Sequence, residues 1–117
     1  GKVVELSNIP VIEYTDEGRL VGHITIGAVY VSEKIAKITD FPEKLRNKVM
    51  HMILSHQGAN EKGSPIVPMF REALLLYFLD EIDSKLNAFD RIIKNEKKEG
   101  VNWSKFVNLI DRYIYLE

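Results

Sequence analysis

The chain contains no cysteine, and this absence excludes disulfide bonds, thiolate zinc sites and a cysteine nucleophile. Histidine, aspartate and glutamate are therefore the side chains available to bind a metal. No apolar run reaches the roughly 18 to 20 residues of a membrane span. The opening segment GKVVELSNIP also lacks the basic and apolar pattern of a signal peptide. These absences predict a cytoplasmic protein without membrane contact.

The chain also lacks an excess of charge of either sign. Its 117 residues carry 16 basic and 17 acidic side chains, a formal net charge of -1, so no overall field attracts nucleic acid or anionic lipid. Any contact with such a partner must be local. The length fits one domain with a modest core. Because the chain begins at Gly1 rather than at Met, we expect residues 1–117 to be a single domain that is the C-terminal portion of a longer one.

The first 22 residues predict short elements. Residues 1–9 look like the end of a helix that Asn8 and Pro10 terminate. Residues 11–22 alternate apolar and polar side chains around the turn-forming sequence Asp16-Glu17-Gly18, which predicts a short hairpin or loop.

The rest of the chain has mainly helical periodicity. Apolar residues at spacings of three and four predict one helix over residues 23–40 and a second over residues 42–58. A loop with two prolines follows at residues 59–68, and a long helix is expected over residues 69–97, apolar on nearly every side in its first half. Residues 101–117 predict either a final helix or an irregular covering segment. The fold class is therefore all-α, a helical bundle.

Two of the three histidines lie five positions apart in HMILSHQG, residues 51–58. Positions five apart on a helix differ by about 140° and cannot share a face. His51 lies one turn before Ser55 on the polar side, whereas His56 lies one turn after Met52 on the apolar side. We therefore expect His51 to face water and His56 to face inward as a candidate metal ligand. The alternative for His56 is a core histidine hydrogen-bonded to a carbonyl.

Two further residues are candidate metal ligands. Asp80 interrupts LLLYFLDEID, the most apolar stretch, and a buried carboxylate is costly unless it is paired, hydrogen-bonded or metal-bound. A salt bridge to a basic residue is the alternative for Asp80. His23 follows Gly22 at the start of its predicted helix, where the alternative is an ordinary N-terminal helix residue. Histidine and aspartate side chains from separate helices build dinuclear metal sites in helical folds. Such sites activate water and bind phosphate oxygens, so the pattern predicts phosphoester hydrolysis.

Several segments, taken in order, resemble one known family. The segments GHITIG, HMILSHQG, E-x-GSP from Glu61 to Pro65, and EALLLYFLDEIDSKLNAF are similar to the HD-domain metal-dependent phosphohydrolases, and among them to the YhaM-type 3′-to-5′ exoribonucleases. The resemblance implies an HD-domain-like helical bundle that hydrolyses phosphodiester bonds of RNA. It implies a divalent metal (Mn, Mg, Zn, Fe or Ni) held by His23, His56 and Asp80. It also places the defining His-Asp pair of the family just before Gly1.

The resemblance further implies a set of residues at the substrate phosphates or in the loops of the site. These are Lys2, Gln57, Glu61, Ser64, Arg71 and Lys85. For the basic members, ordinary surface charge is the alternative. The implied partner is RNA or a nucleotide, bound with the help of segments upstream of this chain.

The sequence departs from the family pattern at two positions. Gln57 stands where the family has a second histidine, and Tyr77 stands where it tends to have a histidine in the central helix. An amide is a poor substitute for an imidazole as a metal ligand. Two alternatives therefore stay open: an HD nucleotidase or cyclic-nucleotide phosphodiesterase acting on small nucleotides, and a degenerate HD domain that serves as a regulatory or interaction module.

Overall fold

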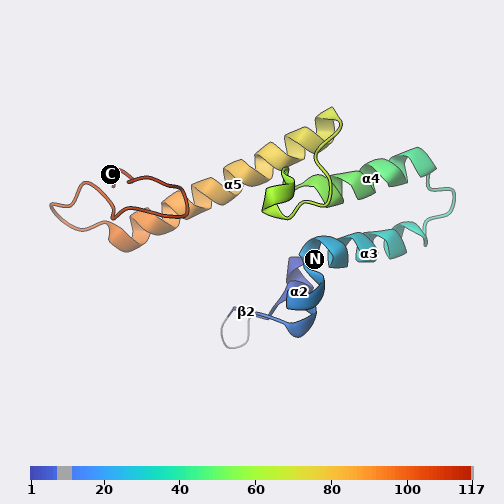
Figure 1. The fold of residues 1–117 in the computed structure, drawn as a ribbon, viewed down its shortest axis with the longest axis horizontal. Coiled ribbons are helices and arrows are strands. Elements are labelled where there is room, and N and C mark those ends of the chain that lie inside the picture. Colours follow the sequence, from blue (N-terminus) through green and yellow to red (C-terminus); the bar gives the residue numbers. More distant parts are fainter. Residues whose placement is uncertain (8–11, 117) are drawn as a thin grey trace. The chain divides into compact units, whose positions relative to one another are not determined.

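A computed structural model describes residues 1–7 and 12–116, which are mainly helical and include one two-stranded antiparallel hairpin. This confirms the predicted all-α class with a short hairpin. Figure 1 shows the elements in chain order: α1 (Lys2–Glu5), β1 (Leu6–Ser7), β2 (Glu13–Tyr14), α2 (Asp16–Val21), α3 (His23–Ile35), α4 (Glu43–Ser55), the 3-10 helix η1 (Asn60–Lys62) and α5 (Arg71–Glu96). No helix of the described part combines the length and hydropathy needed to cross a membrane.

The chain divides into two compact units, Gly1–Tyr77 and Phe78–Glu117. The boundary falls inside α5, which is continuous from Arg71 to Glu96. The first unit contains every element before α5 and the first part of that helix. The second unit contains the rest of α5 and the C-terminal segment.

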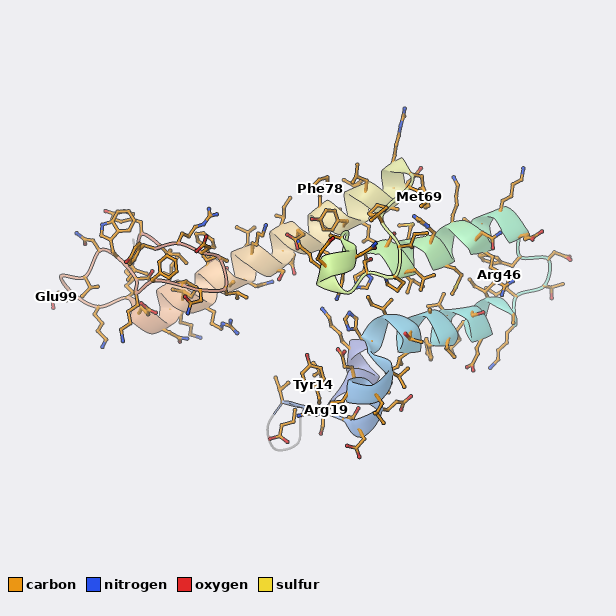
Figure 2. The ribbon with its side chains drawn as sticks, viewed as in Figure 1. Tyr14, Arg19, Arg46, Met69, Phe78 and Glu99 are labelled. Atoms are coloured by element: carbon orange, nitrogen blue, oxygen red, sulfur yellow. The ribbon has the colours of Figure 1, made fainter. Side chains whose placement is uncertain are left out.

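The turn expected at Asp16-Glu17-Gly18 is wrong, because these residues open α2. Thr15 caps this helix, because its Oγ1 accepts the Gly18 N–H at 2.9 Å. Two acidic residues in the first turn interact favourably with the positive end of the helix dipole. The hairpin instead pairs β1 with β2. Figure 2 shows Arg19 of α2 beside Tyr14 of β2, with the guanidinium 5.7 Å from the ring centroid.

The first predicted helix ends earlier than expected. The sequence predicts one helical tail over residues 1–9, but α1 ends at Glu5 and β1 follows it at Leu6–Ser7. The helix stop predicted at Asn8 and Pro10 lies outside the described residues.

Helices α3 and α4 form an antiparallel pair in the first unit and lie side by side (Figure 1). The start of α3 at His23 is as predicted, and its buried residues are Ile24, Ala28 and Ile35, which share one helical face. It ends at Ile35 rather than near Asp40, because residues 36–40 form turns. Helix α4 ends at Ser55, after which the chain reverses through Gly58.

Helix α5 confirms the long helix predicted over residues 69–97, but its surroundings differ from the expectation. We expected its first half to be covered on several faces. Six of its large apolar side chains are instead 45 to 60% exposed: Leu74, Leu75, Phe78, Leu79, Ile82 and Leu86. The number of apolar residues in a helix shows how much surface would gain from burial. It does not show whether other elements are available to cover that surface.

The C-terminal segment is irregular and does not form a final helix, which resolves the two alternatives for residues 101–116. Isolated antiparallel bridges join Trp103 to Tyr115 and Val107 to Arg112. The side chains of Ile114 and Leu116 in this segment are buried. Glu96 at the end of α5 accepts the Lys105 N–H at 2.8 Å. The segment therefore folds as part of the second unit.

Candidate functional site

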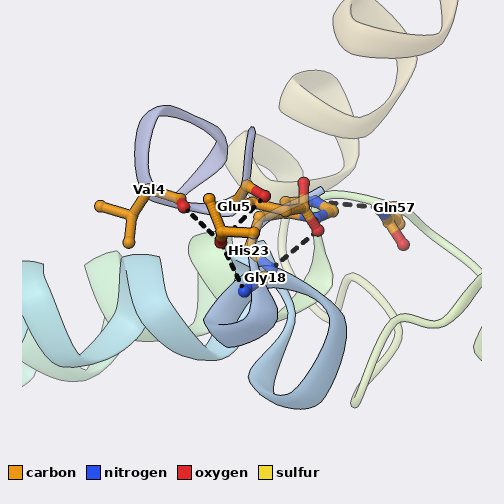
Figure 3. Close-up of polar contacts among 6 residues, drawn as sticks. Val4, Glu5, Gly18, His23 and Gln57 are labelled. Atoms are coloured by element: carbon orange, nitrogen blue, oxygen red, sulfur yellow. Dashed lines mark hydrogen bonds and ion pairs between the residues drawn. The ribbon is translucent and has the colours of Figure 1, made fainter. Parts of the chain in front are cut away.

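The first residue of α3, His23, is held by a carboxylate from α1. Nδ1 of His23 donates to Oε1 of Glu5 at 3.0 Å, and the same oxygen accepts the backbone N–H of His23 at 3.2 Å. Gly22 provides no side-chain cap for α3, so Glu5 supplies the negative group at this helix N-terminus. One side chain thus caps α3 and orients its first imidazole (Figure 3).

Glu5 is well shielded from water, and its side chain keeps only 10% of its accessible surface. Burial raises the pKa of its carboxyl, but the hydrogen bonds from the side chain and backbone of His23, with the electrostatic attraction of His23 and Lys2, outweigh burial and hold this pKa below its ordinary value. The carboxylate is therefore ionised at neutral pH and accepts a hydrogen bond from the Nδ1–H of His23. Thr15 fixes the backbone on which it sits, because the Thr15 N–H donates to the Glu5 carbonyl at 2.9 Å.

The other ring nitrogen of His23 contacts Gln57, just after α4. The amide Nε2 of Gln57 lies 3.1 Å from Nε2 of His23 (Figure 3). An amide nitrogen can only donate, so the imidazole accepts here and carries its proton on Nδ1, toward Glu5. The lone pair that His23 would offer to a metal is engaged by an amide.

His56 occupies the C-cap of α4, next to Gln57. Its Nδ1 donates to the Ile53 carbonyl at 2.6 Å, so Nε2 is the nitrogen left to bind a ligand. This hydrogen bond is the one foreseen for a core histidine, and it is also the one that metal-binding histidines make with their second nitrogen. The rings of His56 and His23 lie 5.6 Å apart between centroids, at 68°. The structure thus brings together two of the three predicted ligands.

The donor set at this place fits part of a divalent metal site. Both imidazoles are anchored through Nδ1 to a carboxylate or carbonyl, the arrangement typical of metal-binding histidines. Within residues 1–7 and 12–116, however, no three His, Asp or Glu side chains are grouped so that they could hold a metal ion. Further ligands would be needed. Gly1 packs closely against the start of α3, because a side chain on Gly1 would overlap the backbone of His23.

Asp80 is not buried, which corrects the expectation on which its selection depended. It lies on α5 in the second unit and is exposed. Asp83 and Ser84, which follow one turn later on the same side of α5, are exposed as well, so water reaches this side of the helix and the carboxylate needs no buried partner. Its assignment as a metal ligand remains a prediction from the family resemblance.

The residues predicted near substrate phosphates fall into two groups. Lys2, Glu61, Arg71 and Lys85 are exposed, and Lys85 forms an ion pair with Glu81 one turn earlier at 3.0 Å. Ser64 is buried, and its hydroxyl lies 2.9 Å from the Leu54 carbonyl and 3.0 Å from the Ile66 carbonyl. Ser64 therefore ties the loop after α4 to the end of that helix.

His51 is half-buried and has partners that helical phase does not predict. Its Nε2 accepts the backbone N–H of Met69 at 3.0 Å, and its ring lies 5.2 Å from the ring of Phe70. Helical phase alone could not reveal this, because the contact comes from the segment that leads into α5. His51 joins the end of α4 to the start of α5 and lies outside the His23–His56 pair.

Glu5 is a residue of this site that the sequence patterns do not predict. The signal was present, because a glutamate in the apolar segment KVVEL is unusual unless it has a partner. Its partner lies 18 positions away, at the first residue of another helix. No periodicity connects the two.

Comparison with known proteins finds relatives named 3′-5′ exoribonuclease YhaM. The chain is 42% identical over 100 residues to a protein of Listeria monocytogenes serotype 4b (strain CLIP80459) named 3′-5′ exoribonuclease YhaM, with 83% of this chain and 31% of the relative covered. Proteins of the same name from Bacillus subtilis (strain 168) and Geobacillus sp. (strain WCH70) are each 40% identical over 97 residues, with 83% of this chain covered.

The chain spans only about a third of the length of these relatives, 31% for the Bacillus subtilis protein. No protein-family model matches it. No solved structure matches it either. The homology therefore covers most of this chain, whereas most of each relative lies outside the match.

Proposed function

We propose that this chain, homologous to proteins named 3′-5′ exoribonuclease YhaM, is the metal-binding part of an HD-type exoribonuclease that hydrolyses RNA phosphodiester bonds. The observation that carries the proposal is the pair of anchored imidazoles. His23 and His56 each engage Nδ1 and lie 5.6 Å apart. Surface histidines have no need of this arrangement, whereas metal ligands do. The substrate would be RNA, and the location would be cytoplasmic.

The roles of the residues follow from their contacts. Glu5 holds the proton on Nδ1 of His23, so that Nε2 keeps its lone pair, and the Ile53 carbonyl does the same for His56. Asp80 is the carboxylate ligand that the resemblance adds. When bound, a divalent metal acts as a Lewis acid, which lowers the pKa of water and neutralises charge on phosphate oxygens. Nitrogen and oxygen ligands together suit Mn, Mg, Zn, Fe or Ni.

A second candidate function is favoured by one contact. The Gln57 amide donates to Nε2 of His23, the nitrogen that a metal needs. A site closed in this way would suit a degenerate domain that regulates or binds a partner and performs no hydrolysis. In the exoribonuclease proposal, the Gln57 amide would have to release Nε2 of His23 for that nitrogen to hold a metal.

The proposal predicts that His56→Gln abolishes RNA hydrolysis. In a longer protein that includes the segment before Gly1, the variant should degrade a 5′-labelled single-stranded RNA in Mn²⁺ at least about 100-fold more slowly than the parent, since removing a ligand costs more than the 10- to 100-fold loss typical of its supporting residues. The products of the parent should shorten stepwise from the 3′ end.

The matched control is His51→Gln, which changes the same residue type in the same helix and keeps a group that can accept the Met69 N–H. It should retain activity within about threefold. Equal activity of His56→Gln and the parent would contradict the proposal. Hydrolysis of mononucleotides or cyclic nucleotides, with RNA left intact, would support the small-nucleotide alternative instead.

A further inference from the structure

The C-terminal segment of the second unit presents aromatic rings to water. Trp103 and Tyr115 lie across an antiparallel bridge, with ring centroids 5.2 Å apart at 57°. Trp103 is 60% exposed and Tyr115 is 50% exposed, whereas their neighbours Ser104, Ile114 and Leu116 are buried. The small buried core therefore holds the two rings in place from below. We call this pair the aromatic platform.

A hollow of about 330 Å³ adjoins the platform. It is lined by Asn95, Glu96, Lys98, Val101, Trp103 and Lys105. The indole and Val101 provide apolar walls, Asn95 provides an amide with donors and an acceptor, and the two lysines provide positive charge. The Glu96 carboxylate is engaged, because its Oε2 accepts the Lys105 N–H at 2.8 Å, and this bond fixes the lysine at the edge of the hollow.

Positive charge gathers at the hollow itself, where the two lysines, Lys98 and Lys105, outnumber the one carboxylate, that of Glu96. This surplus is local, because the whole chain has a formal net charge of -1. A local positive surface beside an exposed aromatic ring is the pattern by which proteins bind single-stranded nucleic acid: bases stack on the ring and phosphates lie on basic side chains.

We infer that the aromatic platform binds single-stranded RNA, with one base stacked on Trp103 in the hollow and the adjoining phosphates on Lys98 and Lys105. The choice of RNA rests on the proposed function. The site itself rests on the exposed indole, the hollow and the charge. It is separate in sequence from the His23–His56 pair and needs no metal, so it would add affinity for the substrate without taking part in hydrolysis.

The test follows Trp103 directly, because it is the only tryptophan of the chain. A short oligouridylate is titrated into the complete 117-residue chain at low salt with EDTA, and the emission of Trp103 is recorded. Saturable quenching is expected. In parallel, anisotropy of a labelled oligouridylate measures affinity for variants. Trp103→Ala should weaken binding about fivefold or more, and Trp103→Phe, which keeps a stacking face, should lose less.

Two further variants separate stacking from charge and from general aromatic exposure. Replacing both Lys98 and Lys105 with alanine should reduce the slope of log affinity against log salt by about 1.4, as expected for two lost phosphate contacts on a single strand. The matched control is Tyr30→Ala, which removes an aromatic side chain of α3 that is 58% exposed and has the Lys34 ammonium 5.0 Å from its ring. It should leave the affinity unchanged.

The inference would be overturned if the oligonucleotide did not quench the emission of Trp103, or if the Trp103→Ala variant bound as tightly as the parent. It would also be overturned if the emission changed with protein concentration alone, because that would show that a second copy of the chain covers the platform. EDTA keeps this test independent of the proposed function. His56→Gln should bind RNA here as the parent does, so loss of hydrolysis and loss of platform binding are distinguishable.

Discussion

Replacing Gly58 with alanine is expected to lower the free energy of unfolding of the first unit by about 2 to 4 kcal/mol. Gly58 has a φ of +81°, which L-residues rarely adopt, and a Cβ atom there would overlap the ring of Tyr77. The ring is half-buried and cannot yield without disturbing the join between the end of α4 and α5. Chemical denaturation of the variant and the parent measures the change.

The matched control is Gly63→Ala in the same unit. Gly63 also has a left-handed backbone, with a φ of +86°, but a Cβ atom there meets only the Gln57 Oε1 at 3.4 Å. It should therefore cost about 1 kcal/mol, the conformational part alone. Equal losses for the two variants would show that the Tyr77 ring moves aside without cost and would contradict the packing described here.

The second large effect is expected from Gln57→His. The Gln57 amide lies 3.1 Å from Nε2 of His23, so an imidazole at this position would place a third nitrogen beside His23 and His56. Calorimetric titration should show Zn²⁺ affinity rising at least about tenfold, which corresponds to roughly 1.4 kcal/mol. Zn²⁺ is chosen because it binds imidazole well.

Two control variants show whether a rise in Zn²⁺ affinity comes from the imidazole at position 57. Gln57→Ala frees Nε2 of His23 without adding a ligand and should give a smaller rise. Asn108→His adds an imidazole at an exposed position of the second unit and should leave the affinity as it is. If Gln57→His binds Zn²⁺ no better than the parent, the pair of histidines is not a weakened metal site, and the regulatory or interaction module becomes the better account.

The sequence predicts where the longer helices lie along the chain. It does not predict the residues at which all of them begin and end. The start of α3 at His23 and the extent of α5 follow from apolar periodicity, which is strong over many residues. The N-terminal region was misjudged because Thr15-Asp16-Glu17-Gly18 combines turn-forming residues with a helix cap. The hydrogen bond from Gly18 N–H to Thr15 Oγ1 decides between them, and such a bond cannot be read from composition.

The candidate site could also be predicted only in part from the sequence. Helical phase selected His56, and the structure places it beside His23. The contacts of Glu5 and of His51 could not be predicted, because each joins residues 18 positions apart through a loop or a helix end. Asp80 was chosen on the assumption that an apolar run is buried, and it is exposed. Burial depends on what the fold brings against a helix, which local sequence does not contain.

The measurement that tests the central claim most directly is a titration of the 117-residue chain with Mn²⁺, followed by NMR of its three histidine rings. The paramagnetic ion broadens resonances near its binding site even when affinity is weak. We predict that the ring signals of His23 and His56 broaden together and most strongly at low Mn²⁺, while those of His51, whose Nε2 accepts the Met69 N–H, broaden less. Equal broadening of all three rings, or broadening of none, would contradict it.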